Sequence, residues 1–206
     1  MKILVLNAGV SSHRSCLYEL GEELLDSSTE PIWQAKIDWT EQSEVGVFHV
    51  KTTHGAHLEE PLLVEERQKA IAYMLNTLWR GSTGIITQLS DIDIIGHGVV
   101  HEAQEYSQVT LVTPDVKAAI EKLAALAPNP NSPTLEGIEM IEQILPQVPQ
   151  VVVFDCMKLS EQTNEASPMD EDLATIDSVM QSLDVHRDWA IAQECWKFKK
   201  EMEQSK

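Results

Sequence analysis

Small and polar residues that could bind an anion gather in a short turn near the start of the chain, Asn7-Ala8-Gly9-Val10-Ser11-Ser12. The apolar run 2–6 before it and residues 15–20 after it predict two strands, so the turn forms the tip of a hairpin. Because Gly9 has no Cβ, this tip can bring backbone N–H groups and serine hydroxyls close to an anion. The same composition is typical of an ordinary turn, so the turn alone leaves phosphate binding and a purely structural role both open.

Other residue types that could hold a metal are scattered. His97 and His101 are four residues apart, but the neighbouring Val99 and Val100 indicate a strand, so the two imidazoles do not share a helical face. A structural role is therefore favoured for both histidines. The three cysteines have no zinc-ligand spacing and suit a reducing cytosol: Cys16, Cys156 and Cys195.

The first half of the chain predicts an antiparallel meander. Alternating apolar residues over 32–39 indicate a third strand, and residues 44–50 indicate a fourth strand or an extension of the meander. Residues 63–80 carry apolar side chains at helical spacing, and Gly81 fits the position just past the helix end. The strand predicted at 91–96 follows this helix, which implies a parallel crossover.

The second half continues the α/β pattern. Thr113 is suited to cap a helix in which Pro114 takes the first position, and residues 127–130 should end that helix near Leu126. A further helix is predicted over 133–145, and residues 148–154 predict a buried parallel strand. The predicted element order is β-β-β-α-β-α-α-β.

Composition limits the kinds of partner. The chain has 206 residues and a formal net charge of −18, which suits one domain and argues against nucleic acid or an anionic membrane surface as a partner. No apolar run approaches the length of a membrane span, and the N-terminus lacks the cleavage region of a signal peptide. We therefore expect a cytoplasmic protein.

Four motifs, in order along the chain, resemble those of the acetate kinase family of the actin-like superfamily. The first turn resembles N-A-G-S-S-S, and residues 94–101 (IIGHGVVH) resemble I-G-H-R-V-V-H-G-G. Residues 126–131 with 135–138 are similar to L-A-P-x-H-N-P-x-x-L-x-G-I, and residues 148–155 (VPQVVVFD) to V-P-x-V-A-V-F-D-T. The resemblance is to the cyanobacterial type, and each motif is altered.

The resemblance implies an α/β fold: a single actin-like, ribonuclease H-like lobe, in which an antiparallel meander leads into parallel strands with flanking helices. Residues 1–159 resemble the family's N-terminal lobe, and residues 160–177 form an acidic linker in place of its second, nucleotide-binding and dimerising lobe. Residues 178–206 resemble the family's C-terminus, where a strand and a helix beginning near D-W-A-I-A return to the N-terminal lobe. We expect Trp189, Ile191, Ala192 and Trp196 to face the sheet.

The resemblance also assigns candidate site residues. Asn7 and Asp155 match an Asn and a catalytic Asp that follow adjacent strands, where α/β sheets place ligands. Ser11 and Ser12 match the phosphate loop, and Arg14 replaces a Lys, which keeps the charge but changes its geometry. If activity is retained, ATP and Mg would be required, with Mg near Asn7; otherwise no cofactor is expected.

Three other family positions have lost their chemistry. Val10 replaces a phosphate-loop Ser, Gly98 replaces the Arg that holds substrate, and Pro130 replaces a His that stabilises the transition state. Removing one well-placed donor of this kind typically slows catalysis on the order of a hundred- to a thousand-fold. Independent acetate kinase activity is therefore not expected.

Three functional hypotheses follow. In the first, the chain is a catalytically inactive relative of acetate kinase that acts as a binding or regulatory module, with an unidentified protein partner whose surface is basic. In the second, it is a phosphotransferase (ATP and acetate to ADP and acetyl phosphate) with residual activity or completed in trans by a partner, using Asn7, Arg14 and Asp155. In the third, the chain is a decaying gene product. The first is the favoured hypothesis.

Overall fold

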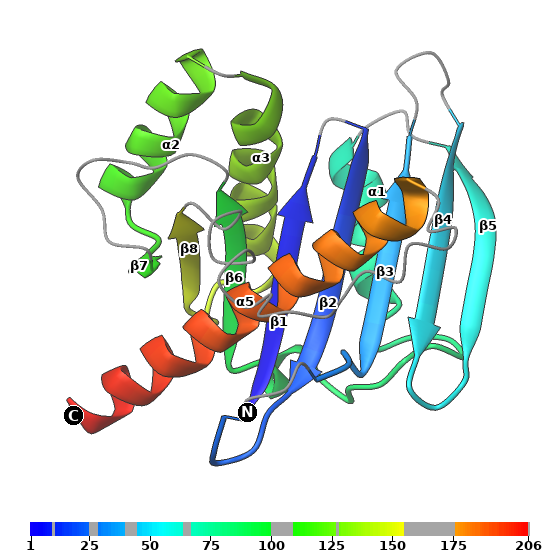
Figure 1. The fold of residues 1–206 in the computed structure, drawn as a ribbon, viewed down its shortest axis with the longest axis horizontal. Coiled ribbons are helices and arrows are strands. Elements are labelled where there is room, and N and C mark those ends of the chain that lie inside the picture. Colours follow the sequence, from blue (N-terminus) through cyan, green and yellow to red (C-terminus); the bar gives the residue numbers. More distant parts are fainter. Residues whose placement is uncertain are drawn as a thin grey trace.

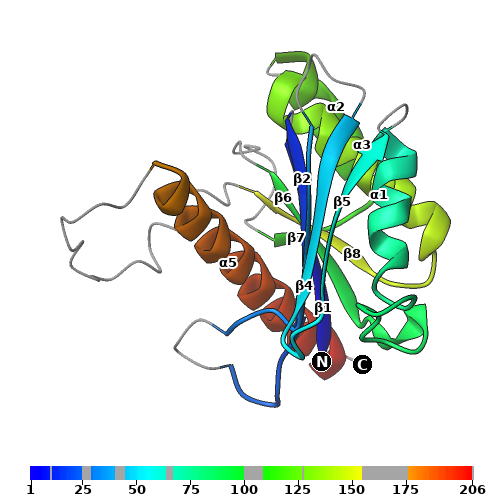
Figure 2. The same cartoon turned by 90° about the vertical axis from the view of Figure 1, so that its right-hand side faces the viewer.

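The computed structural model describes residues 1–9, 11–24, 29–39, 45–63, 67–99, 109–126, 128–154 and 176–205, without the side chains of 126, 128–132 and 176–183. These residues form three layers (Figures 1 and 2). One mixed sheet lies between helix α5 (Ile176–Gln204) on one face and three helices on the other: α1 (Arg67–Asn76), α2 (Pro114–Leu126) and α3 (Pro128–Ile144). No helix among the described residues is long and apolar enough to cross a membrane.

The described strands form a sheet of eight in the order β5-β4-β3-β2-β1-β6-β8-β7. Neighbours from β5 to β1 are antiparallel, whereas β6 is parallel to β1 and β8 is parallel to β6. This is the predicted change from an antiparallel meander to parallel strands, and the predicted fold class is confirmed. The strands are β1 (Lys2–Ala8), β2 (Ser12–Glu19), β3 (Trp33–Asp38), β4 (Val45–Thr52), β5 (His57–Leu63), β6 (Ile94–Val99), β7 (Val109–Leu111) and β8 (Gln150–Phe154).

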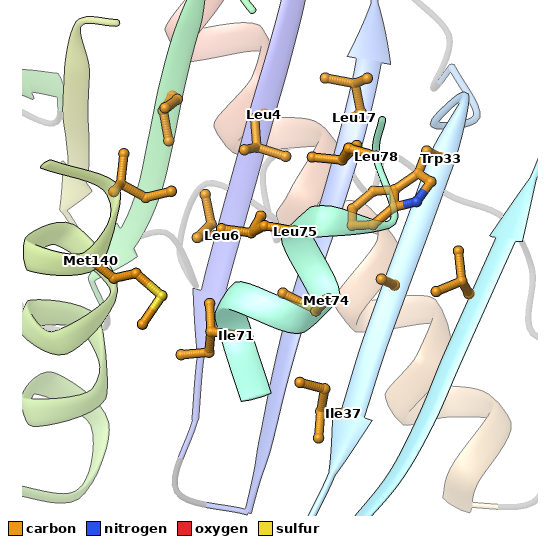
Figure 3. Close-up of a cluster of buried hydrophobic side chains, with 14 of the residues drawn as sticks. Leu4, Leu6, Leu17, Trp33, Ile37, Ile71, Met74, Leu75, Leu78 and Met140 are labelled. Atoms are coloured by element: carbon orange, nitrogen blue, oxygen red, sulfur yellow. The ribbon is translucent and has the colours of Figure 1, made fainter. Parts of the chain in front are cut away.

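Hydrophobic clusters bury both faces of the central strands, and a third cluster lies between β6, β8 and the helices α2 and α3. On one face, apolar side chains of β1 to β3 pack against α1 and the turn after it, and Met140 of α3 closes the side of this cluster (Figure 3). On the other face, Ile3, Val5 and Tyr18 pack against Trp189, Ile191 and other residues of α5. Helix α5 therefore covers a sheet face that would otherwise expose apolar side chains to water.

The contacts of α5 agree with the pattern predicted for it. Trp189, Ile191 and Ala192 are buried against the sheet. Trp196 is half-buried, and its indole Nε1–H donates to the carbonyl oxygen of Gly21 at 3.1 Å. One detail was wrong: no strand precedes this helix within residues 176–204, because these residues form one continuous helix.

Two strands were missed. β5 spans residues that were left unassigned, and its last residue, Leu63, was predicted to begin the helix that starts at Arg67. Leu63 is 66% exposed at the end of this edge strand, so its apolar side chain does not mark the buried face of a helix. β7 has only three residues, too few to show a strand period.

The boundary between α2 and α3 was also misplaced. The predicted end at Leu126 is confirmed, but α3 begins at Pro128, five residues before the predicted start at Pro133. The first turn of a helix has N–H groups without intrahelical partners, so proline is tolerated there. Pro128 and Pro130 thus begin the next helix, and Pro133 lies inside it.

Candidate functional site

Two of the predicted site residues lie next to each other where the first hairpin meets α5. Asn7 near the end of β1 is the direct cross-strand partner of Arg14 on β2. Both follow the same alternation as Val5 and Cys16, which belong to the core beneath α5, so both side chains are on the face that α5 covers. Arg14 is 6% exposed, which is rare for a cation.

Backbone hydrogen bonds fix the turn between these two strands. The Gly9 N–H donates to the Ser12 carbonyl oxygen at 2.8 Å, and a Cβ on Gly9 would lie 3.2 Å from that oxygen. The Ser11 carbonyl oxygen accepts a hydrogen bond from the Trp39 N–H at 2.8 Å. The Gly9 N–H is therefore used within the turn, while Ser11 is exposed and Ser12 half-buried.

A carboxylate from α5 engages both candidate phosphate ligands. Asp188 Oδ2 lies 2.7 Å from Nε of Arg14, and Asp188 Oδ1 accepts a hydrogen bond from the Asn7 side-chain amide. The Cys16 thiol donates to Asp188 Oδ2 at 3.3 Å. Asp188 is 1% exposed, so this carboxylate has been removed from water and depends on these three partners.

The ionisation of this cluster follows from its burial. Burial raises the pKa of the Asp188 carboxyl, although the Arg14 guanidinium opposes that change. Burial also works against the charged form of Arg14, but Asp188, with help from Asp184 at 3.6 Å, outweighs it and raises the Arg14 pKa. Burial, followed by the charge of Asp188, raises the pKa of Cys16 well above its usual range. Arg14 is therefore a permanent cation whose nearest anion belongs to the protein itself.

Of the three altered family positions, Gly98 and Pro130 are among the described residues. Gly98 is a buried residue of β6, and its carbonyl oxygen accepts a hydrogen bond from the Thr134 hydroxyl of α3 at 3.4 Å. Pro130 lies in the first turn of α3. Val10 and Asp155 are outside the described residues. The prediction that Asn7 and Asp155 follow adjacent strands was wrong, because β6 lies between β1, which carries Asn7, and β8, which ends at Phe154.

The described residues do not fit a magnesium site. Asp188, the carboxylate that contacts Asn7, is already paired with a guanidinium, and the Asn7 amide donates to it. Within the described part of the chain, no three His, Cys, Asp or Glu side chains converge as metal ligands. Mg²⁺ binds through oxygen ligands, usually one or two carboxylates, and the carboxylate of Asp188 is occupied by Arg14. No chemical step is therefore assigned to a metal here.

Two buried histidines lie on the opposite face of the sheet. His97 contacts the Gln150 amide oxygen at 2.7 Å, and the Gln150 amide nitrogen donates to the Ile138 carbonyl oxygen at 3.5 Å. That orientation of the amide makes His97 the donor. His13 contacts the Ser15 hydroxyl at 3.3 Å. Burial lowers the pKa of His13 to about 3 and that of His97 to about 4, so both are neutral near pH 7.

The chain belongs to the acetokinase family, whose model matches residues 2–167. It is 49% identical over 156 residues to an acetate kinase from Nostoc sp., a match that covers 75% of this chain and 38% of that enzyme. It is 51% identical over 168 residues to an acetate kinase from Rippkaea orientalis, covering 81% and 41% respectively. The chain therefore spans about two fifths of the length of these relatives.

Solved structures agree with this relationship. The crystal structure of Porphyromonas gingivalis acetate kinase matches with a TM-score of 0.65 and 29% identity, over 75% of this chain and 37% of that one. A propionate kinase from Francisella tularensis matches with a TM-score of 0.60 and 24% identity, over 88% of this chain and 43% of that one, which shows a shared fold.

Sequence reasoning missed the residue that organises this site. Asp188 was considered only as the start of a helix, because the partners it neutralises are at the other end of the chain. One signal was present in the sequence: Asp188 directly precedes Trp189 and Ile191 in the apolar stripe of the helix. A carboxylate beside a buried apolar stripe needs a buried partner, and Arg14 is a cation inside the second strand of the first hairpin.

Proposed function

We propose that this chain is a member of the acetokinase family that does not phosphorylate acetate by itself and acts as a binding or regulatory module for another protein. The observation that carries this proposal is the engagement of both Asn7 and Arg14 by Asp188. An ATP phosphate would have to displace a buried carboxylate that already satisfies the cation. Gly98, where the family resemblance places a substrate-binding Arg, offers no side chain to hold acetate.

The charge of the chain bears on the kind of partner. With a net charge of −18, the protein attracts basic surfaces and repels acidic ones. Apolar side chains also gather on the outer strands, where Val45 and Leu63 are cross-strand partners and are 46% and 66% exposed. Exposed apolar groups of this kind suit a protein contact. A basic protein partner is therefore the proposed one.

The test of the catalytic part is acetyl phosphate formation by the purified chain with Mg-ATP and acetate. We expect no more product than the Asp155→Asn variant makes, while a full-length acetate kinase from Nostoc sp. in parallel gives ready turnover. Product above the Asp155→Asn level would overturn the proposal, because it would mean that phosphate reaches Arg14 in spite of Asp188.

The binding part needs a partner that depends on the proposed surface. A tagged chain is incubated with native extract, and each captured protein is then purified and titrated against the wild type and a Val45→Glu/Leu63→Glu variant. We expect at least one basic protein that binds the wild type and loses binding to the variant, but keeps it with Lys122→Glu on α2. A monodisperse monomer that captures nothing, or captures equally with every variant, argues against a partner at this surface.

A second candidate function is a phosphotransferase completed in trans by a partner lobe. It is favoured by the direct pairing of Asn7 with Arg14, which keeps a cation and an amide together near the carboxyl end of β1. In this case the native complex, but not the isolated chain, makes acetyl phosphate, and Asp155→Asn abolishes that activity. If the variant leaves every activity of the complex unchanged, this candidate fails.

A further inference from the structure

A pocket lies beside the buried cluster, on the same face of the sheet. Its volume is about 340 Å³, and it is lined by residues of β2 to β5 together with Asp184 and Val185 of α5. Figure 1 shows the N-terminal end of α5 passing in front of the meander strands. The walls include the apolar side chain of Val185, and most of the polar side chains that line the pocket are basic.

Strand register explains why basic groups converge there. Arg14 on β2 is the direct partner of Lys36 on β3, and Lys36 is the direct partner of His49 on β4. In the next row, Lys51 on β4 is the direct partner of His57 on β5. Because these positions share the alternation of the strands, all five side chains are on one face. Arg14 and Lys36 are like charges directly opposite each other, which destabilises a sheet unless anions compensate them.

The protein supplies that compensation at only one side of the pocket. Arg14 is paired with Asp188, and Lys36 with Asp38 at 2.8 Å. His49 lies 3.3 Å from Glu59, which also lines the pocket. Among the described residues, no carboxylate lies within ion-pair distance of Lys51 or His57. These two residues form the uncompensated side, in a chain whose 33 acidic residues outnumber its 15 lysines and arginines.

We propose that this pocket binds a small phosphorylated molecule, with Lys51 and His57 holding the phosphate. An ammonium is a compact point charge that suits phosphate, and an imidazole supplies an N–H donor. Val185 provides an apolar wall for the rest of the molecule, and the Gln34 amide supplies a polar contact. The volume is at the lower end of the range for ligand pockets, roughly 300–1,000 Å³, so the ligand is compact. This proposal does not rest on the proposed function, because the two residues that would bind the phosphate, Lys51 and His57, are outside the Asn7–Asp188 cluster.

The test is calorimetric titration with pyrophosphate, repeated with inorganic phosphate and with citrate at matched ionic strength, because salt screens such contacts. Lys51→Gln/His57→Asn removes the proposed phosphate ligands. Lys122→Gln/His54→Asn makes the same chemical changes at exposed positions that do not line the pocket. Thermal unfolding of both double variants establishes that each is folded.

We expect saturable pyrophosphate binding that weakens by about tenfold or more in the first variant, as loss of charged hydrogen bonds requires, and stays within about twofold in the control. Absence of saturable binding, or equal binding by both variants, would contradict the proposal that Lys51 and His57 bind phosphate in this pocket. Citrate binding more tightly than pyrophosphate would overturn the assignment to phosphate in favour of a polycarboxylate. None of these results bears on acetyl phosphate formation, so failure here and failure of the proposed function can be told apart.

Discussion

The guanidinium Nε of Arg14 lies 2.7 Å from Oδ2 of Asp188, which joins the second strand to the C-terminal helix through a buried ion pair. This pair links the N-terminal hairpin to the C-terminal helix, close to the turn between β1 and β2 where the family resemblance places phosphate. The same contact has two effects: it orients α5 on the sheet, and it gives Arg14 an internal anion. Asp188 therefore contributes both to the stability of the fold and to the proposed loss of phosphate binding.

Replacing Asp188 by Asn should be strongly destabilising. The variant leaves Arg14 buried without its counter-ion, and breaking a buried pair from one side typically costs about 3–5 kcal/mol. Urea unfolding measures the change. Asp184→Asn is the matched control, because Asp184 is 30% exposed and lies 3.6 Å from Arg14, so we expect a loss below about 1 kcal/mol.

The double variant Arg14→Met/Asp188→Leu tests whether the charge itself is needed. Replacing both members of a buried pair by apolar residues is often neutral or stabilising, so we expect it to be more stable than Asp188→Asn. A double variant as unstable as Asp188→Asn, or a single variant within about 1 kcal/mol of wild type, would show that the pair does not hold α5 in place.

Acid should destabilise the protein through His13 and His97. In the unfolded chain both imidazoles take up a proton near pH 6.5, whereas burial lowers their folded pKa values to about 3 and about 4. Stability from these groups is complete above pH 6.5 and is lost as the pH falls toward the folded pKa values. At pH 5 the loss is about 2 kcal/mol for each histidine.

The measurement is the urea midpoint of wild type and His97→Gln between pH 7.5 and 5. The variant removes one of the two groups, so its midpoint should fall less steeply with decreasing pH. His54→Gln, an exposed position, should reproduce the wild-type slope. Parallel slopes for all three proteins would mean that His97 does not titrate differently in the folded and unfolded states.

Elements with a continuous buried run could be predicted from the sequence, and short or edge elements could not. The strands β1, β6 and β8 were predicted because each contains four or more consecutive buried residues. β5 was missed because it is an edge strand with mixed exposure and contains Pro61 and two glutamates. Its identity comes from pairing with β4, which no local pattern reveals.

Only the residues that the first hairpin contributes to the candidate site could be predicted from the sequence. Asn7 and Arg14 are seven residues apart on two strands of one hairpin, so their proximity follows from local structure. Asp188 reaches them only through the packing of α5 on the sheet, which depends on all of the apolar contacts beneath that helix. Sequence resemblance pointed to the helix but identified neither the buried carboxylate nor its role.

The two described cysteines should be unreactive in the folded protein. Cys16 and Cys195 are buried, and burial raises the pKa of both thiols. Because the thiolate is the reactive form, a Cys156→Ser variant should release no colour with a disulfide reagent at pH 8 until it is unfolded, when two thiols react. Rapid reaction of one thiol in the native protein would show that α5 opens readily from the sheet.

Close packing between β6 and α5 leaves no room for a side chain at Gly96. A Cβ there would collide with Sγ of Cys195 and lie 2.8 Å from Cγ2 of Ile191. We expect Gly96→Ala to destabilise the protein by about 1–3 kcal/mol in urea unfolding, as overpacking does. Gly137→Ala in α3 meets no atom within 4 Å and should be neutral or stabilising by up to about 1 kcal/mol.

Adding Cys195→Ala to Gly96→Ala should recover part of the loss, because it removes the sulfur in the collision. If the second substitution only adds to the first, the contact between β6 and α5 is looser than described.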